Sequence, residues 1–293
     1  MDSELGVIVV FGALGVWAAL LALGTRSKRW GMFLGFGILL MLYLNLRYFI
    51  DGAPSSISFF IGIYDVLDNV GLSSSDTVDG MAPCVDNACT VWGDRYQQHP
   101  SWGVAFHDRF LNGPQWRTNL LYGHIGANTV AFVLMHVQLW RPGVGVHRDR
   151  HRLLGRVSFA AVSVGTLCAV LLAAEHGSVE EYRGWFSTFG FWFMSFCVYG
   201  CAVMMVRTIR AGDVQAHRKW TIWFVGSMWG SFWLFRVILF VLDPLLRNVE
   251  ALALQIVIWG SAPLGIWLAE QLRRRGVAVV EAQDSPETEP ALS

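Results

Sequence analysis

Long apolar stretches constrain this chain more than any other feature of its sequence. Seven of them cover residues 5–24, 30–50, 119–140, 156–176, 185–207, 219–242 and 251–271. At a rise of about 1.5 Å per residue, a helix of this length crosses a hydrocarbon layer of about 30 Å. Only helices satisfy their backbone as single segments in lipid. The sequence therefore predicts an all-α polytopic integral membrane protein with seven transmembrane helices.

The composition agrees with a membrane environment. The 293 residues are 54% hydrophobic and only 15% charged, whereas soluble domains carry roughly 25% charged residues. The formal net charge of zero gives no sign of a nucleic-acid partner. No Gly-rich segment has the spacing and strand context of a phosphate-binding loop. The expected surroundings are therefore membrane lipids.

Basic residues alternate between the connections and predict an orientation. They gather after the first, third, fifth and seventh stretches, in 26–29, 141–156, 207–219 and 273–275. Cytoplasmic connections are enriched in Lys and Arg, so we expect the N-terminus outside and the C-terminus in the cytoplasm of the plasma (inner) membrane. The first stretch lacks a basic leading region and reads as a retained helix.

The apolar pattern also divides the chain. Residues 1–50 are expected to form two peripheral helices, 119–242 a four-helix membrane core (spans 3–6), and 243–275 a seventh span. The extracytoplasmic segment 51–118 opens with a candidate interfacial helix and carries Cys84 and Cys89. We interpret these cysteines as a disulfide loop, with a metal site that includes His99 or His107 as the alternative. Residues 276–293 are expected to be a disordered cytoplasmic tail.

Histidines fall at two depths within the predicted bundle. The outer level holds His124 and His176, and the inner level holds His136, His151 and His217. Two levels of histidine suit axial ligation of heme b by facing helices. The alternative is that these are hydrogen-bonded or interfacial histidines without a cofactor. Both interpretations remain open at this stage.

Other polar residues accompany the histidines. The outer ends of the spans also hold Arg47, Asn128, Glu175 and Arg236. They predict either an outward-facing polar cavity or one structural ion pair with snorkelling neighbours. The inner ends hold a basic set that fits a small anion or a lipid headgroup: Arg152, Arg156, Arg218 and Lys219.

These motifs resemble domain-of-unknown-function family 2306, a family of predicted bacterial membrane proteins. The resemblance covers roughly residues 98–240. The matching positions are His124, Gln138, His151, Arg152, Gly155, Arg156, Asp213, His217, Arg218, Trp220 and Arg236. It implies a four-helix core and no established activity, and its pattern includes neither His136 nor His176. A fainter likeness to diheme cytochrome b membrane proteins rests on the spacing of His151 and Gly155.

Three functional hypotheses follow. The first is a membrane-embedded b-type heme electron carrier or oxidoreductase, which takes electrons from a quinol or another redox partner. Its outer heme would use His124 and His176, and its inner heme His136 with His217 or His151. The second is a non-redox binding or transport protein with the basic cytoplasmic anion or lipid-headgroup site. The third is an accessory subunit of a larger membrane complex that docks through 51–118. Within span 3, His124 is the expected functional histidine and His136 an optional second site.

Overall fold

A computed structural model describes residues 3–27, 30–52, 56, 114–140, 148–174, 185–246 and 252–274. Within these ranges the chain is helical and contains no strand. The helices are α1 (Ser3–Ser27), α2 (Gly31–Ile50), α7 (Gln115–Trp140), α8 (Arg148–Ala174), α9 (Trp185–Arg210), α10 (Val214–Trp229), η3 (Gly230–Leu234), α11 (Phe235–Leu246) and α12 (Leu252–Arg274). The elements α10, η3 and α11 follow one another without a break, and η3 is a π-helical turn within one long helix.

Six of these helices are long and apolar enough to cross a membrane. They begin at Gly31, Gln115, Asp149, Trp185, Val214 and Leu252. A shorter apolar helix, Phe11–Arg26, lies within α1. The predicted fold class, an all-α polytopic membrane protein, is confirmed. The predicted disulfide loop, the interfacial helix and the tail 276–293 lie outside the described residues.

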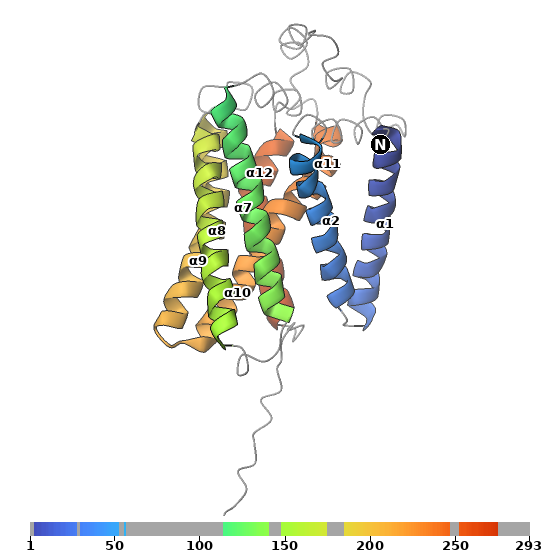
Figure 1. The fold of residues 1–293 in the computed structure, drawn as a ribbon. Helices are drawn as coiled ribbons and strands as arrows, with labels where there is room; N and C mark the ends of the chain where they lie inside the picture. The colour runs from blue at the N-terminus through green and yellow to red at the C-terminus, as the bar shows by residue number, and fades with distance from the viewer. Residues whose placement is uncertain are drawn as a thin grey trace, which may run out of the picture.

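Successive helices run in opposite directions across the bundle (Figure 1). One end of the bundle, called the Tyr48 end below, holds the end of α2 and the start of α7. The opposite end, called the His217 end, holds the start of α8 and the start of α10. The turn from α9 to α10 lies at the His217 end. There Gly212 adopts a positive φ of 79°, a conformation in which a residue without a Cβ is least strained.

Four helices form a ring in which each contacts the next: α7 with α8, α8 with α9, α9 with α10, and α10 with α7. The ring places α8 and α10 across from each other. The seventh expected span, α12, packs along both α9 and α10, whereas α1 packs on α2 and α2 packs on α7. The helices expected as the core are therefore in mutual contact, and α12 is joined to them as closely as they are to one another.

Small residues bring α10 and α12 into backbone contact. A Cβ added at Gly226 would lie 2.5 Å from the Ala269 Cβ and 2.7 Å from the Gly265 carbonyl oxygen. One added at Gly230 would overlap the Ser261 carbonyl oxygen. Gly226 and Gly230 are four residues apart, the spacing at which two glycines share one helix face and allow close helix packing in membranes.

Polar side chains join neighbouring helices inside the bundle. The Ser158 hydroxyl in α8 donates to the Ala131 carbonyl of α7 at 3.2 Å, and the Thr188 hydroxyl in α9 donates to the Ala173 carbonyl of α8 at 2.9 Å. The Asn45 amide in α2 donates to the Thr129 hydroxyl of α7 at 2.6 Å. Bonds of this kind add to helix association in lipid, where water does not compete for the same groups.

Candidate functional site

His124 is held in one orientation by its neighbours near the Tyr48 end. Its Nδ1 lies 3.0 Å from the Gly165 carbonyl oxygen of α8 and 3.0 Å from the Asn128 side-chain amide one turn along α7. A carbonyl oxygen only accepts, so Nδ1 carries the ring proton, and Nε2 keeps the lone pair. The structure places the Asn128 amide nitrogen beside Nδ1, and a protonated Nδ1 requires the amide turned so that its oxygen faces the ring. His124 and Asn128 are therefore in contact on one face of α7.

Gly165 makes this arrangement sterically possible. A Cβ at Gly165 would lie 2.5–2.8 Å from all three terminal atoms of the Asn128 side chain. Any larger residue would therefore displace the amide from its place beside His124. The close approach of α7 and α8 at this level positions the imidazole.

Arg236 lies directly after the π turn, in the first turn of α11. Its Nη1 donates to the Phe232 carbonyl oxygen at 2.9 Å, and its guanidinium carbon lies 4.0 Å from the centre of the Phe232 ring. No carboxylate among the described residues pairs with it. π turns are frequent at functional sites, because they shift backbone groups out of the regular helical ladder.

Tyr48 completes a polar cluster that the sequence analysis missed. Its side chain is only 6% exposed, and it lies within electrostatic range of Arg236. Arg236 is within the same range of His124. Tyr48, His124, Asn128 and Arg236, called the Arg236 cluster below, thus come from α2, α7 and α11. A Tyr at a helix end is typical of an interfacial aromatic belt, so the sequence carries no separate signal for this role.

Of the other residues predicted at the outer ends of the spans or in the outer segment, Arg47 is described by the structure and the rest are not. Arg47 forms an ion pair with Asp51, with Nε 3.4 Å from Oδ2, and its guanidinium lies 6.0 Å from the centre of the Tyr43 ring. Glu175, His176, Cys84 and Cys89 lie outside the described residues. The described cysteines, Cys168, Cys197 and Cys201, are free thiols.

His136 occupies a different environment although it belongs to the same helix as His124. Its Nδ1 donates to the Phe132 carbonyl at 2.7 Å, and its Nε2 accepts from the Trp229 indole at 2.8 Å. The side chain is 5% exposed and packs beside the Phe132 ring. Both ring nitrogens are therefore committed, and His136 in this arrangement has no lone pair for a metal.

His151 and His217 both lie at the His217 end. They belong to the first turns of α8 and α10, the helices that face each other across the ring, and lie within electrostatic range of one another. The His217 Nδ1 donates to the Met205 carbonyl of α9 at 2.9 Å, which leaves Nε2 as the lone-pair nitrogen. His151 makes no hydrogen bond to the described residues. The two histidines thus offer unoccupied ring nitrogens from opposite helices.

The basic residues at the His217 end are mainly at the surface. Arg152, Arg156 and Arg218 are exposed. The Arg152 Nη1 lies 4.0 Å from the Asp149 Oδ1, which is a long ion pair. Lys219 lies against an aromatic face, with its ammonium nitrogen 4.4 Å from the centre of the Trp223 ring. Apart from the Arg152–Asp149 contact, no ion pair involves these four residues within the described ranges.

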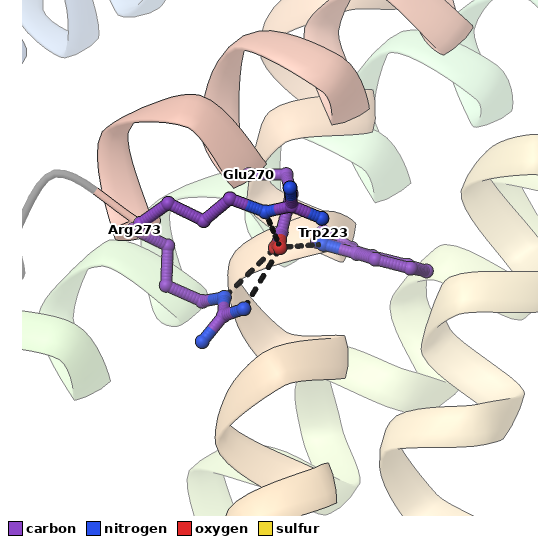
Figure 2. Close-up of polar contacts among 4 residues, drawn as sticks. Trp223, Glu270 and Arg273 are labelled. Carbon is purple, nitrogen blue, oxygen red and sulfur yellow. Dashed lines mark hydrogen bonds and ion pairs between the residues drawn. The ribbon is translucent and has the colours of Figure 1, made fainter.

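Glu270 forms a second polar cluster, which the sequence analysis also missed. Its carboxylate accepts from the Trp223 indole at 2.9 Å, from Arg273 at 2.8 Å and from Arg274 at 2.7 Å. Figure 2 shows the carboxylate between the Trp223 indole of α10 and the guanidinium groups of α12. Because its acceptors are occupied and its charge is paired, we interpret this cluster as a link between α10 and α12.

The described residues contain no group of three or more His, Cys, Asp or Glu side chains able to hold a metal ion. A bis-histidine heme site needs only two imidazoles, because the porphyrin supplies the remaining ligands.

The fold and these clusters define a polytopic helical membrane protein with polar groups inside its bundle. More particularly, the chain belongs to DUF2306, a family described as predicted membrane protein, which matches residues 121–271. The family resemblance found in the sequence is confirmed, and the matched region also includes almost all of α12. No curated protein and no solved structure matches the chain.

Proposed function

We propose that the protein is a membrane-embedded electron carrier that binds heme b between His151 and His217. The observation that carries the proposal is the hydrogen bonding of these two imidazole rings, which leaves a ring nitrogen of each without a partner among the described residues. The His217 Nδ1 donates to a backbone carbonyl, a bond that fixes the tautomer and orients the other nitrogen toward a metal. The nearby His151 has no competing hydrogen bond to a described residue.

The helix arrangement supports the same pair. Helices α8 and α10 face each other across the ring, so ligands from both reach a cofactor between them. Gly155 lies one turn after His151, on the same face of α8. A Cβ at Gly155 would meet only the Gln138 amide oxygen, at 3.5 Å, so this face has room beside the histidine. Bound heme would supply a one-electron couple, and the chain would hold it through the two imidazoles.

The proposal revises the ligands expected at the inner level. His136 is dropped, because both of its nitrogens are already bonded. An outer heme with His124 and His176 stays a prediction, since His176 lies outside the described residues.

We also propose that the His217 end faces the cytoplasm, because it carries most of the Lys and Arg residues of the spans.

The test is spectroscopic. The protein, expressed with added heme precursor and purified in mild detergent, should show a reduced-minus-oxidised spectrum of b-type heme. His151→Ala and His217→Ala should each lose that signal. Arg218→Gln is the matched control, because Arg218 adjoins His217 and its side chain is exposed; it should keep full heme content. A colourless, well-folded wild-type protein would refute the proposal.

A second candidate function is recognition of anionic lipid headgroups by the basic residues of the His217 end. The favouring observation is that Arg156 and Arg218 are exposed and form no ion pair with a described residue. Clusters of Lys and Arg next to a membrane span attract anionic lipids. Under this alternative, the purified protein would be free of heme. Arg156→Gln and Arg218→Gln together would then reduce its retention of anionic phospholipid.

A further inference from the structure

Arg236 is a partly buried cation that pairs with no carboxylate among the described residues. Arg236 lies inside the span Val214–Leu239. Within the described part of the chain, its guanidinium donates to one neutral carbonyl oxygen and lies over one aromatic ring, both from Phe232. A charged group in a membrane interior is costly unless it is paired. A cation–π contact and a single carbonyl bond offset only part of that cost.

Two further polar atoms of the Arg236 cluster also lack partners. The Tyr48 hydroxyl and the His124 Nε2 make no hydrogen bond to a described residue. Neither atom is among the fully enclosed polar atoms without partners in the described part of the chain, although the Tyr48 side chain is only 6% exposed. Tyr48 packs in one cluster with Leu121 and Ile125, which neighbour His124 on α7, and Arg236 lies within electrostatic range of Tyr48 and of His124.

We propose that the Arg236 cluster binds the carboxylate of a long-chain fatty acid or of a closely similar amphiphile. The guanidinium of Arg236 is a planar donor that matches the two oxygens of a carboxylate. The Tyr48 hydroxyl supplies one more donor to the ionised carboxylate. Together the guanidinium and the hydroxyl would complete the pairing that the described residues leave unmade.

Charge and surroundings favour a monoanion on an apolar chain. Arg236 is the one cation among the four residues of the cluster, and one positive charge matches one carboxylate. Arg47, outside the cluster, is paired with Asp51. The lipid-facing sides of the adjoining helices are apolar: Leu46 is 47% exposed on α2, and Val237 and Val241 are 40% and 57% exposed on α11. An acyl chain would lie along these faces while its head contacts Arg236.

The inference does not depend on heme, because His151 and His217 lie at the opposite end of the bundle. Binding of a tritiated long-chain fatty acid to the purified protein tests it. The wild type should bind saturably, and the fatty alcohol of equal chain length should not compete. Arg236→Gln should weaken binding at least about tenfold, as expected for loss of a charge-assisted bond. Tyr48→Phe, which removes only a hydroxyl, should weaken it by a smaller factor.

Arg117→Gln is the matched control, because Arg117 lies at the same end of the bundle, where its guanidinium is 5.7 Å from the centre of the Trp116 ring. It should bind as the wild type does, and Arg236→Gln should keep any heme signal. Equal affinity in the wild type, Arg236→Gln and Tyr48→Phe would overturn the inference. Equal competition by the alcohol would also overturn it. Stronger competition by an anionic phospholipid or by acetate would overturn the assignment to a fatty-acid carboxylate.

Discussion

At the scale of single residues, the two histidines of α7 show how hydrogen bonding determines what an imidazole can do. Both rings carry their proton on Nδ1, because each Nδ1 faces a backbone carbonyl oxygen. They differ at Nε2. In His136 this atom accepts from Trp229, and in His124 it has no partner within the described residues. His136 therefore links two helices, whereas His124 keeps a nitrogen for a ligand or a proton.

The bond between His136 and Trp229 should be measurable as a coupling energy. His136→Ala, Trp229→Phe and the double variant form a cycle that isolates it. We expect the two single changes to be non-additive by about 0.6 kcal/mol and by no more than about 1.7 kcal/mol, the average and the maximum for hydrogen bonds between membrane helices. Equilibrium unfolding in mixed detergent micelles measures each variant. Strict additivity would show that the indole and the imidazole act independently.

Part of the site could be predicted at this scale. Polar residues in an apolar span are conspicuous, so His124, Asn128 and Arg236 could be identified from the sequence. Tyr48 and Glu270 could not, for different reasons. Tyr48 is a common residue type at a helix end, and its partner Arg236 is 188 positions away along the chain. The Glu270–Arg274 pair has the helical i,i+4 spacing and was detectable, whereas its bond to Trp223 depends on how α10 crosses α12.

At the scale of elements, the crossing of α10 and α12 depends on glycine. A Cβ at Gly265 would overlap the Gly226 carbonyl oxygen and would lie 2.8 Å from the Gly230 Cα. Gly265→Ala should therefore separate the helices or bend one of them, at a cost of about 1–3 kcal/mol. The expected readout is a lower midpoint of unfolding in SDS.

Gly260→Ala provides the control on the same helix. A Cβ at Gly260 would meet no atom within 4 Å. Ala also favours helix over Gly by roughly 0.8–1 kcal/mol, so this variant should be as stable as the wild type or slightly more so. If Gly265→Ala behaves like Gly260→Ala, the contact between α10 and α12 is looser than the structure indicates.

Apolar length was sufficient to predict the existence of the spans, because a helix in lipid must be long and apolar. Local detail was harder to predict. The span expected at 219–242 begins earlier, at Val214, where the Asp213 side chain accepts from the Ala216 amide at 2.8 Å and caps the helix. The π turn at Gly230–Leu234 has no apolar signature of its own, because its residues suit a regular transmembrane helix equally well.

At the scale of the whole molecule, charge is distributed unevenly between the two ends. The His217 end holds the last turns of α1, α9 and α12 with Arg26, Arg207, Arg210, Arg273 and Arg274. It also holds Arg152, Arg156, Arg218 and Lys219 near the starts of α8 and α10. At the Tyr48 end, Arg47 pairs with Asp51, and Arg117 lies in the first turn of α7. Such an asymmetry orients membrane proteins during insertion.

The orientation that follows can be measured with two matched substitutions. Gln115 and Gln215 are both exposed; Gln115 begins α7 at the Tyr48 end, and Gln215 is the second residue of α10 at the His217 end. In a chain whose five native cysteines are replaced by serine, Gln115→Cys should react with an impermeant thiol reagent added to intact cells. Gln215→Cys should react only after the membrane is permeabilised. Labelling in the reverse order would place the His217 end outside, against the direction that the basic residues favour.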